Sequence, residues 1–119
     1  MTDLDATMAD VKVNSNVSFS VSEMQTGYCQ QKGWDAEDPR CTRVTMTGQL
    51  NKVTDRDEQK FALDALFSRH PEMPSWSHAH QFYPVRLDLN MVWVIDFFGG
   101  ATVLDPKDYY AVNSTMILD

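Results

Sequence analysis

Three histidines and a carboxylate lie in one short stretch of the chain, at His70, Glu72, His78 and His80. Imidazole and carboxylate groups are the usual ligands of zinc and related metals, and a site needs several of them to converge. The stretch also contains two prolines, so it is predicted to be an irregular loop with nothing to force convergence. We expect loop histidines and no metal site, with His70 at the C-terminus of a helix, where a cation is favoured.

Two aspartates, Asp88 and Asp96, fall in or beside strongly apolar segments, where a carboxylate could serve as a general base. A carboxylate in this setting more commonly bonds turn amides or an arginine, and Arg86 is a candidate partner for either one. The sequence contains no Ser-His-Asp spacing, no phosphate-binding P-loop and no GxGxxG motif. It therefore predicts no catalytic residue.

A flavin mononucleotide (FMN) site needs hydroxyl, Lys or Arg donors around the phosphate and a flat apolar slot for the ring. Arg43, Thr45 and Thr47 alternate along one expected strand, so they share a face and are weak FMN candidates. The pattern is too common in strands to be a signature. We expect no cofactor.

Two cysteines, Cys29 and Cys41, bound a segment whose Gly, Asp and Pro content is typical of a loop. Two cysteines are too few for a structural zinc site by themselves. A disulfide between them would close a loop of about 13 residues and stabilise the fold by roughly 2–3 kcal/mol. The favoured interpretation is a disulfide formed in an oxidising compartment, and the alternative is two separate buried thiols.

Two Asn-x-Ser/Thr tripeptides are candidate glycosylation sites, although such tripeptides often arise by chance. Asn16 begins one of them and falls in an expected strand. Asn113 begins the other in an expected exposed tail, so it is the better acceptor.

Composition bounds the class of protein. The 119 residues suit one domain, and the 43% hydrophobic and 23% charged content is ordinary for a globular chain. The net charge of −7 and the lack of a basic stripe argue against nucleic acid and against an anionic membrane. No apolar run approaches the roughly 20 residues of a membrane span, and the acidic start does not resemble a signal peptide. Taken alone, that start indicates a cytosolic chain.

The first half of the chain is expected to form a helix and two strands. Residues 2–13 have apolar side chains at helical spacing, with Thr2 or Asp3 as the cap. Residues 16–24 alternate Val and Phe with Ser, as in a half-buried antiparallel strand. Residues 42–53 predict a second strand.

The second half is expected to contain two helices and two strands. A helix capped by Thr54 or Asp55 runs through residues 57–69, and Pro71 ends it. Strands follow at residues 82–89 and 91–98. A short helix then opens at Pro106.

The strand at residues 91–98 is apolar on both faces, so each face needs a cover. The helix over residues 57–69 can cover part of one face, and a second copy of the chain can cover the rest. We therefore predict a two-fold homodimer with Trp93 or Phe97 near its interface.

The most specific motifs are RHPEM at residues 69–73 and WV-x-D-x-FGG at residues 93–100. The other matching residues are Cys29, Gly33, Trp34, Asp35, Cys41, Gly48, Leu66, Phe67, Trp76, His80, Leu87, Tyr109 and Tyr110. In this combination the chain resembles the CREG (cellular repressor) family from about residue 2 to residue 113.

The resemblance implies a mainly β fold with helices, the FMN-binding split β-barrel with Greek-key topology, in the pyridoxamine 5′-phosphate oxidase-like (PNPOx-like) superfamily. It also implies a secreted or endolysosomal glycoprotein that forms homodimers, does not insert into membranes and has an obstructed flavin pocket. A protein receptor is a further implied partner. Only the C-terminal two-thirds of the family pattern is matched, so we expect residues 1–119 to be a single split-barrel domain that is incomplete at its N-terminus.

Three hypotheses follow. The leading one is a non-enzymatic CREG-like domain that acts through dimerisation and protein contacts. The alternative is an FMN-dependent oxidoreductase of the pyridoxamine-phosphate oxidase type. The third is an inert truncated relative.

Overall fold

The computed structural model describes residues 1–76 and 78–112. The chain divides into two compact units, which we call unit 1 (Met1–Val17 and Gln49–Asp88) and unit 2 (Ser18–Gly48 and Leu89–Asp119). No helix among the described residues has the length and apolar character needed to cross a membrane. In chain order the elements are α1 (Ala6–Val13), β1 (Asn16–Ser22), η1 (Glu23–Thr26), α2 (Tyr28–Gln31), β2 (Arg43–Lys52), α3 (Arg56–Arg69), η2 (Met73–Ser75), η3 (His78–His80), β3 (Val85–Ile95), β4 (Thr102–Leu104) and α4 (Pro106–Ala111).

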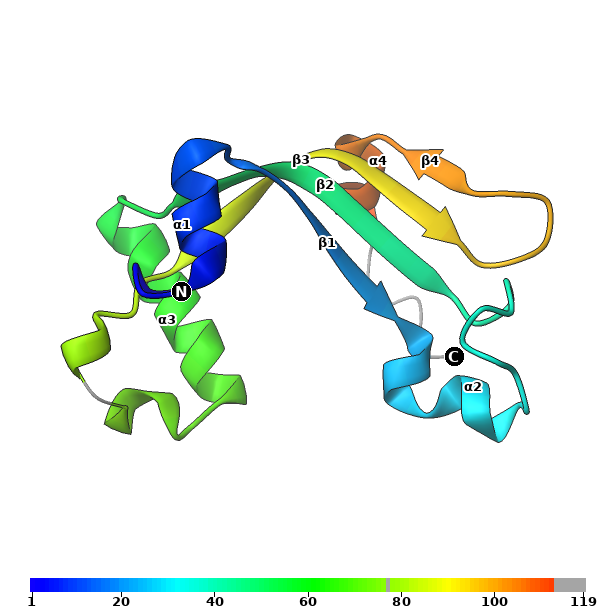
Figure 1. The fold of residues 1–119 in the computed structure, drawn as a ribbon, viewed down its shortest axis with the longest axis horizontal. Coiled ribbons are helices and arrows are strands. Elements are labelled where there is room, and N and C mark those ends of the chain that lie inside the picture. Colours follow the sequence, from blue (N-terminus) through cyan, green and yellow to red (C-terminus); the bar gives the residue numbers. More distant parts are fainter. Residues whose placement is uncertain (77, 113–119) are drawn as a thin grey trace. The chain divides into compact units, whose positions relative to one another are not determined.

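The four strands form one sheet in the order β1-β2-β3-β4, so every strand pairs with its neighbour in sequence (Figure 1). Strands β3 and β4 are antiparallel, with Trp93 opposite Val103. Strands β1 and β2 are antiparallel as well, because Ser15 O accepts from Leu50 N at one end and Thr42 O accepts from Glu23 N at the other. The mixed helix and strand content and the antiparallel sheet confirm this part of the expected fold class.

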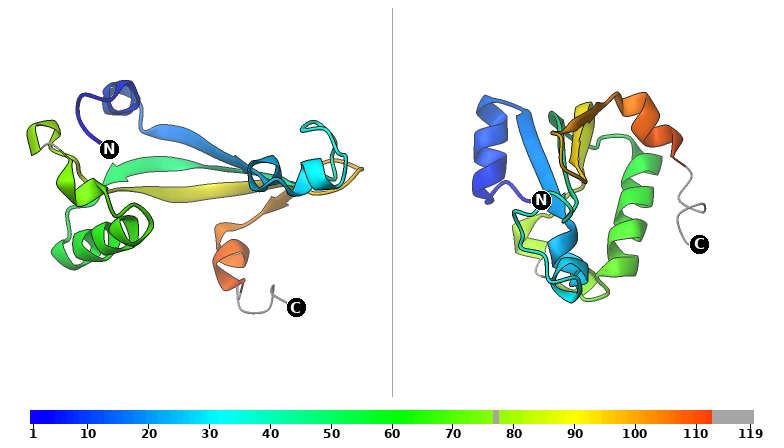
Figure 2. Two further views of the ribbon diagram at one scale, coloured as in Figure 1. Left: turned by 90° about the horizontal axis from the view of Figure 1, so that it is seen from below. Right: turned by 90° about the vertical axis from the view of Figure 1, so that its right-hand side faces the viewer.

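In unit 1 the helices α1 and α3 lie on opposite sides of the strand ends that belong to this unit (Figure 2). Helix α1 begins later than predicted, and its cap is Asp5, whose side chain accepts from Thr7 N at 3.0 Å. Neither predicted cap holds that position. Thr2 donates its hydroxyl to His80 O, and Asp3 accepts from the phenol of Tyr83. The N-terminal residues therefore bind the chain before β3 instead of starting the helix.

The start of α3 was predicted correctly. Asp55 caps it by accepting from Asp57 N at 3.1 Å and Glu58 N at 2.9 Å. The side chain of Glu58 does not complete a reciprocal capping box with Asp55. It instead accepts from Arg86 Nη1 at 2.6 Å, which connects the first turn of α3 to β3.

Two predicted strands, residues 82–89 and 91–98, are one continuous strand, β3. Asn90 was taken as a break, but it is exposed within the strand, and a polar side chain at such a position is tolerated. The strand ends at Ile95, earlier than predicted. Gly99 and Gly100 have φ of 110° and 103°, values that side chains disfavour, and they turn the chain toward β4.

In unit 2 the sequence missed three short elements, η1, α2 and β4. Helix α4 was predicted at its observed start, with Pro106 in the first turn and Asp105 accepting from Lys107 N at 2.8 Å. The most deeply buried side chains of the described residues all belong to this unit: Cys29, Cys41 and Val92, each 0% exposed.

Candidate functional site

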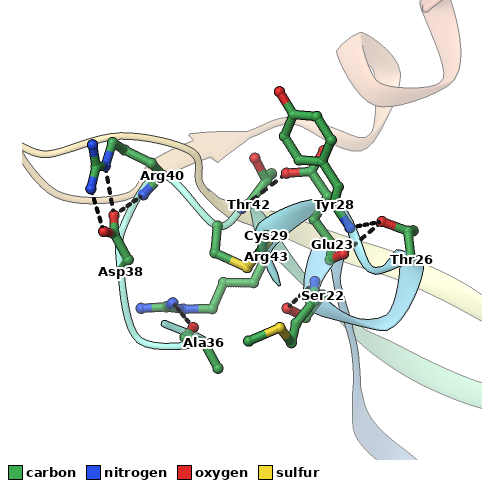
Figure 3. Close-up of a disulfide and its surroundings, with 12 residues drawn as sticks. Ser22, Glu23, Thr26, Tyr28, Cys29, Ala36, Asp38, Arg40, Thr42 and Arg43 are labelled. Atoms are coloured by element: carbon green, nitrogen blue, oxygen red, sulfur yellow. Dashed lines mark hydrogen bonds and ion pairs between the residues drawn. A yellow bond between two sulfur atoms is a disulfide. The ribbon is translucent and has the colours of Figure 1, made fainter. Parts of the chain in front are cut away.

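A disulfide joins Cys29 in α2 to Cys41, two residues before β2, and it closes the loop at residues 30–40 (Figure 3). The bond expected from the loop composition is therefore present, and no free cysteine remains. The Cα atoms of the two residues are 5.5 Å apart, and both side chains are fully buried. The alternative of two separate thiols is wrong for this structure.

The closed loop is also held by an arginine–carboxylate pair. Arg40 donates to both carboxylate oxygens of Asp38, from Nε at 2.9 Å and from Nη2 at 2.6 Å (Figure 3). Hydrogen bonds from the Arg40 side chain and backbone lower the pKa of Asp38 to about 2. The same side-chain bonds raise the pKa of Arg40. Charge-assisted bidentate pairs of this kind fix geometry, so the Arg40 guanidinium is held in one orientation.

That orientation places Arg40 against two aromatic rings. Its guanidinium carbon lies 4.9 Å from the Trp34 ring centroid and 5.9 Å from that of Phe98. Tyr28 packs edge-on against Trp34 at 6.0 Å, and Phe97 packs edge-on against Phe98 at 5.5 Å. These five side chains form a continuous row from α2 through the disulfide loop to the turn before β4, and we call it the ring row.

The ring row was not predicted. Trp34 was identified as a residue that matches the family pattern, and the Phe pair was assigned to a strand. The signal that could have found the row is the sequence Phe97-Phe98-Gly99-Gly100, because two glycines after two aromatic residues predict a turn with rings at its tip. Both Phe side chains are 61% exposed.

The two dimer-interface candidates have different surroundings. Trp93 lies within β3, is half-buried, and faces Val103 across the β3–β4 pair. Phe97 lies beyond the end of β3 and belongs to the ring row. Only Trp93 therefore lies within a strand, whereas Phe97 lies in the turn that follows β3.

Two of the three FMN candidates contact other groups of the chain. Arg43 donates to Ala36 O at 3.0 Å, and its guanidinium lies 3.9 Å from the Glu37 carboxylate. A hydrogen bond of 2.7 Å joins the hydroxyls of Thr45 and Ser20. Thr47 shares the strand with them and is half-buried. Protein groups therefore contact two of the three predicted donor side chains, and a carboxylate lies beside one of them.

The predicted histidine loop lies in unit 1. His70 is the C-cap of α3, through its backbone N–H to Leu66 O at 2.8 Å, and His78 and His80 lie in η3. Within residues 1–76 and 78–112, no three His, Cys, Asp or Glu side chains are grouped so that they could hold a metal. A cavity of about 230 Å³ lies beside His78, and most of its wall is apolar. Its remaining lining residues are Met1, Leu63, Leu66, Phe67, Met73, Pro74, Trp76, Gln81, Phe82 and Tyr83.

Asp88 has a structural role. It accepts from Arg86 Nε at 2.6 Å and from Asn51 Nδ2 at 2.7 Å, and these bonds lower its pKa. The predicted pairing of Arg86 with Asp88 is therefore confirmed. Asp96 is exposed just beyond β3.

A second polar cluster of unit 1 surrounds Tyr83. Its hydroxyl donates to Asp3, which raises the pKa of Tyr83 and lowers the pKa of Asp3. The ammonium of Lys52 lies 3.8 Å from the centre of the Tyr83 ring. Lys12 adds an ion pair to Asp3 at 3.5 Å. These partners satisfy one another, so the cluster is explained as packing of the N-terminal segment.

The glycosylation candidates differ in what the structure describes. Asn16 is the exposed first residue of β1, and its amide donates to Asn14 Oδ1 at 2.9 Å. Asn113 lies outside the described residues.

Comparison with known proteins identifies the family. Residues 1–111 match the family model described as "CREG, beta-barrel". The chain is similar to protein CREG1 of Gallus gallus, with 39% identity over 95% of this chain and 58% of the relative. It is 36% identical to CREG1 of Mus musculus, over 92% of this chain and 50% of the relative. It is 33% identical to CREG2 of Homo sapiens, over 92% of this chain and 38% of the relative. The chain therefore spans about half the length of the curated relatives it matches. The match to the family model covers nearly the whole chain, and the chain belongs to the CREG β-barrel family.

Proposed function

We propose that the chain is a non-enzymatic CREG-like domain that acts through dimerisation and protein contacts. Its sheet would form part of a Greek-key split barrel, and the protein would be a secreted or endolysosomal glycoprotein. The family match supports the CREG-like assignment. The disulfide supports an oxidising compartment, because such bonds persist there.

One observation carries the proposal of protein contacts. Among the described residues only five hydrophobic side chains are buried, whereas fifteen large hydrophobic side chains are exposed. The exposed set includes Phe19 at 54%, Phe61 at 74%, Phe97 at 61% and Tyr110 at 67%. Exposed apolar area on this scale is typical of chains that bury it against partners.

The proposal includes a homodimer with Trp93 near its interface. Light scattering after gel filtration at micromolar concentration should give twice the chain mass. Trp93→Glu should convert the dimer to a monomer, because a buried interface tolerates an unpaired carboxylate poorly. Trp76→Glu is the matched control, since Trp76 is 47% exposed in unit 1 and should leave the mass unchanged. A monodisperse monomer for the unmodified chain would contradict the dimer.

The absence of bound FMN is part of the same proposal. Its support is the engagement of Arg43 and Thr45 with protein groups. Purified protein mixed with FMN and passed through gel filtration should emerge colourless. Co-elution of the two-band flavin absorption with the protein would instead favour the oxidoreductase alternative.

A further inference from the structure

The ring row has an exposed end. Phe97 and Phe98 are each 61% exposed at the turn before β4, and Tyr28 at the other end is 41% exposed. Trp, Tyr and Arg are the residue types most enriched at the energetic centres of protein interfaces, and the row contains one of each. Several aromatic rings exposed together on a surface indicate a docking site when the charge of the neighbouring residues complements a partner.

The row is held in place before any partner arrives. The disulfide fixes both ends of the loop that carries Trp34 and Arg40. The bidentate pair with Asp38 fixes the Arg40 side chain between the Trp34 and Phe98 rings. A preorganised surface loses less conformational entropy on binding, so more of its contact energy appears as affinity.

The unit that contains the row has more acidic than basic residues. Unit 2 has four lysines and arginines against eight aspartates and glutamates, which gives it a formal net charge of −4. The disulfide loop contributes the exposed Asp35 and Glu37, and the Glu37 side chain is 91% exposed, with one cation, the Arg43 guanidinium, 3.9 Å from its carboxylate. Asp96 directly precedes the Phe pair and is exposed. A partner of positive charge complements this surface, whereas a phosphate backbone or an anionic lipid surface does not.

The rings of the row already contact cations from within the chain. Arg40 lies against Trp34 and Phe98, and the ammonium of Lys32 lies 5.4 Å from the centre of the Tyr28 ring. The ring faces therefore have the geometry and environment that cation–π contacts need. The exposed rings of Phe97 and Phe98 can offer the same contact to a cation from outside.

We propose that the ring row, with the exposed Phe97 and Phe98 as its main contact residues, docks a basic segment of a partner protein in which lysine or arginine alternates with apolar side chains. The apolar side chains would pack on the two Phe rings, and the cations would lie over ring faces and beside Asp35, Glu37 and Asp96. This inference rests on the proposed role in protein contacts. It assigns the dimer to Trp93 and reserves Phe97 for a different partner.

The test uses two fluorescein-labelled peptides of equal length, one alternating Lys or Arg with Leu and one with Glu in place of every basic residue. Fluorescence anisotropy with the full chain should show that the basic peptide binds and that the acidic peptide does not. Phe97→Ala and Phe98→Ala should each weaken it by about fivefold or more, the effect expected for an interface centre. Phe61→Ala is the matched control, because Phe61 is 74% exposed in unit 1 and should have no effect.

A second pair of variants separates docking from general attraction to an acidic chain. The double variant Asp35→Asn with Glu37→Gln should weaken binding of the basic peptide. The double variant Asp57→Asn with Glu72→Gln makes the same charge change in unit 1 and should leave that binding unchanged. Equal weakening by both pairs, equal binding of both peptides, or equal effects of Phe61 and Phe98 substitution would each overturn the proposal. Far-UV circular dichroism confirms that each variant is folded.

Failure of this inference is distinguishable from failure of the proposed dimer. Trp93→Glu should lower the mass measured by light scattering from dimer to monomer and leave peptide binding intact. Phe97→Ala should weaken peptide binding and leave the dimer mass unchanged. If Phe97→Ala abolishes the dimer, the ring row is an interface between copies of the chain, and the proposal of a basic partner is wrong.

Discussion

The two units of the chain are stabilised by different means. Unit 2 has a disulfide, three fully buried side chains and a row of edge-on rings with cations against them. Unit 1 has no disulfide, and its described contacts are mainly helix caps, charged pairs and hydrogen bonds from the N-terminal segment. Arg86, for example, bonds both Glu58 in α3 and Asp88 in β3. A covalent bond constrains the unfolded chain, whereas exposed charged pairs contribute little each.

The difference indicates which unit can present a fixed surface. A site that binds a partner needs side chains held in one arrangement, and unit 2 holds Arg40 from several directions at once. Unit 1 holds its apolar side chains around a cavity whose wall includes exposed Trp76 and Phe82. Substitutions that weaken one unit and spare the other would establish this contrast.

The largest effect is expected from removing the disulfide. Replacing both cysteines, as Cys29→Ala with Cys41→Ala, should lower the free energy of unfolding by about 2–3 kcal/mol, because the unfolded chain regains the entropy of an open loop. Hydrogen exchange followed by mass spectrometry should show the loss of protection in unit 2, around α2 and the start of β2. Equal loss of protection in unit 1 would mean that the units unfold as one, and the contrast between them would fail.

A smaller effect is expected at the cap of α3 in unit 1. Asp55→Ala removes the acceptor for two backbone N–H groups and should cost about 1 kcal/mol in urea unfolding. Thr54→Ala is the control, because Thr54 is the exposed neighbour that does not hold the cap position. If the two variants lose the same stability, the cap assignment is wrong.

Unit 1 should gain stability at Gln81, which has φ of 47°. Glycine adopts this conformation without steric cost, so Gln81→Gly should raise the free energy of unfolding by up to about 1 kcal/mol. Gln81→Ala keeps the Cβ atom and should show no such gain. A lower midpoint of thermal unfolding for the glycine variant would show that the side chain contributes more than the conformation costs.

The smallest effect concerns pH and unit 2. The pKa of Asp38 is lowered in the folded chain from 3.8 to about 2, so below the higher value the unfolded chain binds more protons. The stability from this carboxylate is therefore present above 3.8 and is lost as the pH falls through about 2. Asp38→Asn should be less stable than the parent near neutral pH, and the difference should shrink across that window. Thermal midpoints measured for both proteins across this range test it, and a constant difference would contradict the assignment.

The sequence predicted the elements whose signals are local. Asp55 before an amphipathic run gave the start of α3, and Asp105-Pro106 gave the start of α4. Alternation in residues 16–24 gave β1, which ends slightly earlier at Ser22. Loop composition between two cysteines indicated the disulfide, although composition alone left separate thiols open.

The sequence could not predict what depends on residues that are distant along the chain. Thr2 and Asp3 were predicted to be helix caps from their local sequence. Their actual partners, His80 and Tyr83, are about 80 residues away, and no local pattern indicates such bonds. The contact of Arg40 with Phe98 likewise joins a loop to a turn that no spacing rule connects. The ring row, on which the proposed docking site depends, therefore required the structure.

The position of Lys32 inside the disulfide-closed loop affects how the protein responds to proteases. Lys32 is exposed, and it lies between the two bridged cysteines. Trypsin cuts after lysine, and exposed loop residues are preferred sites of nicking. A single cut at Lys32 would leave both fragments joined through sulfur, so the protein would migrate as one band until a reductant separated it into two. Preparations of this protein that look intact on a non-reducing gel can therefore contain nicked chains.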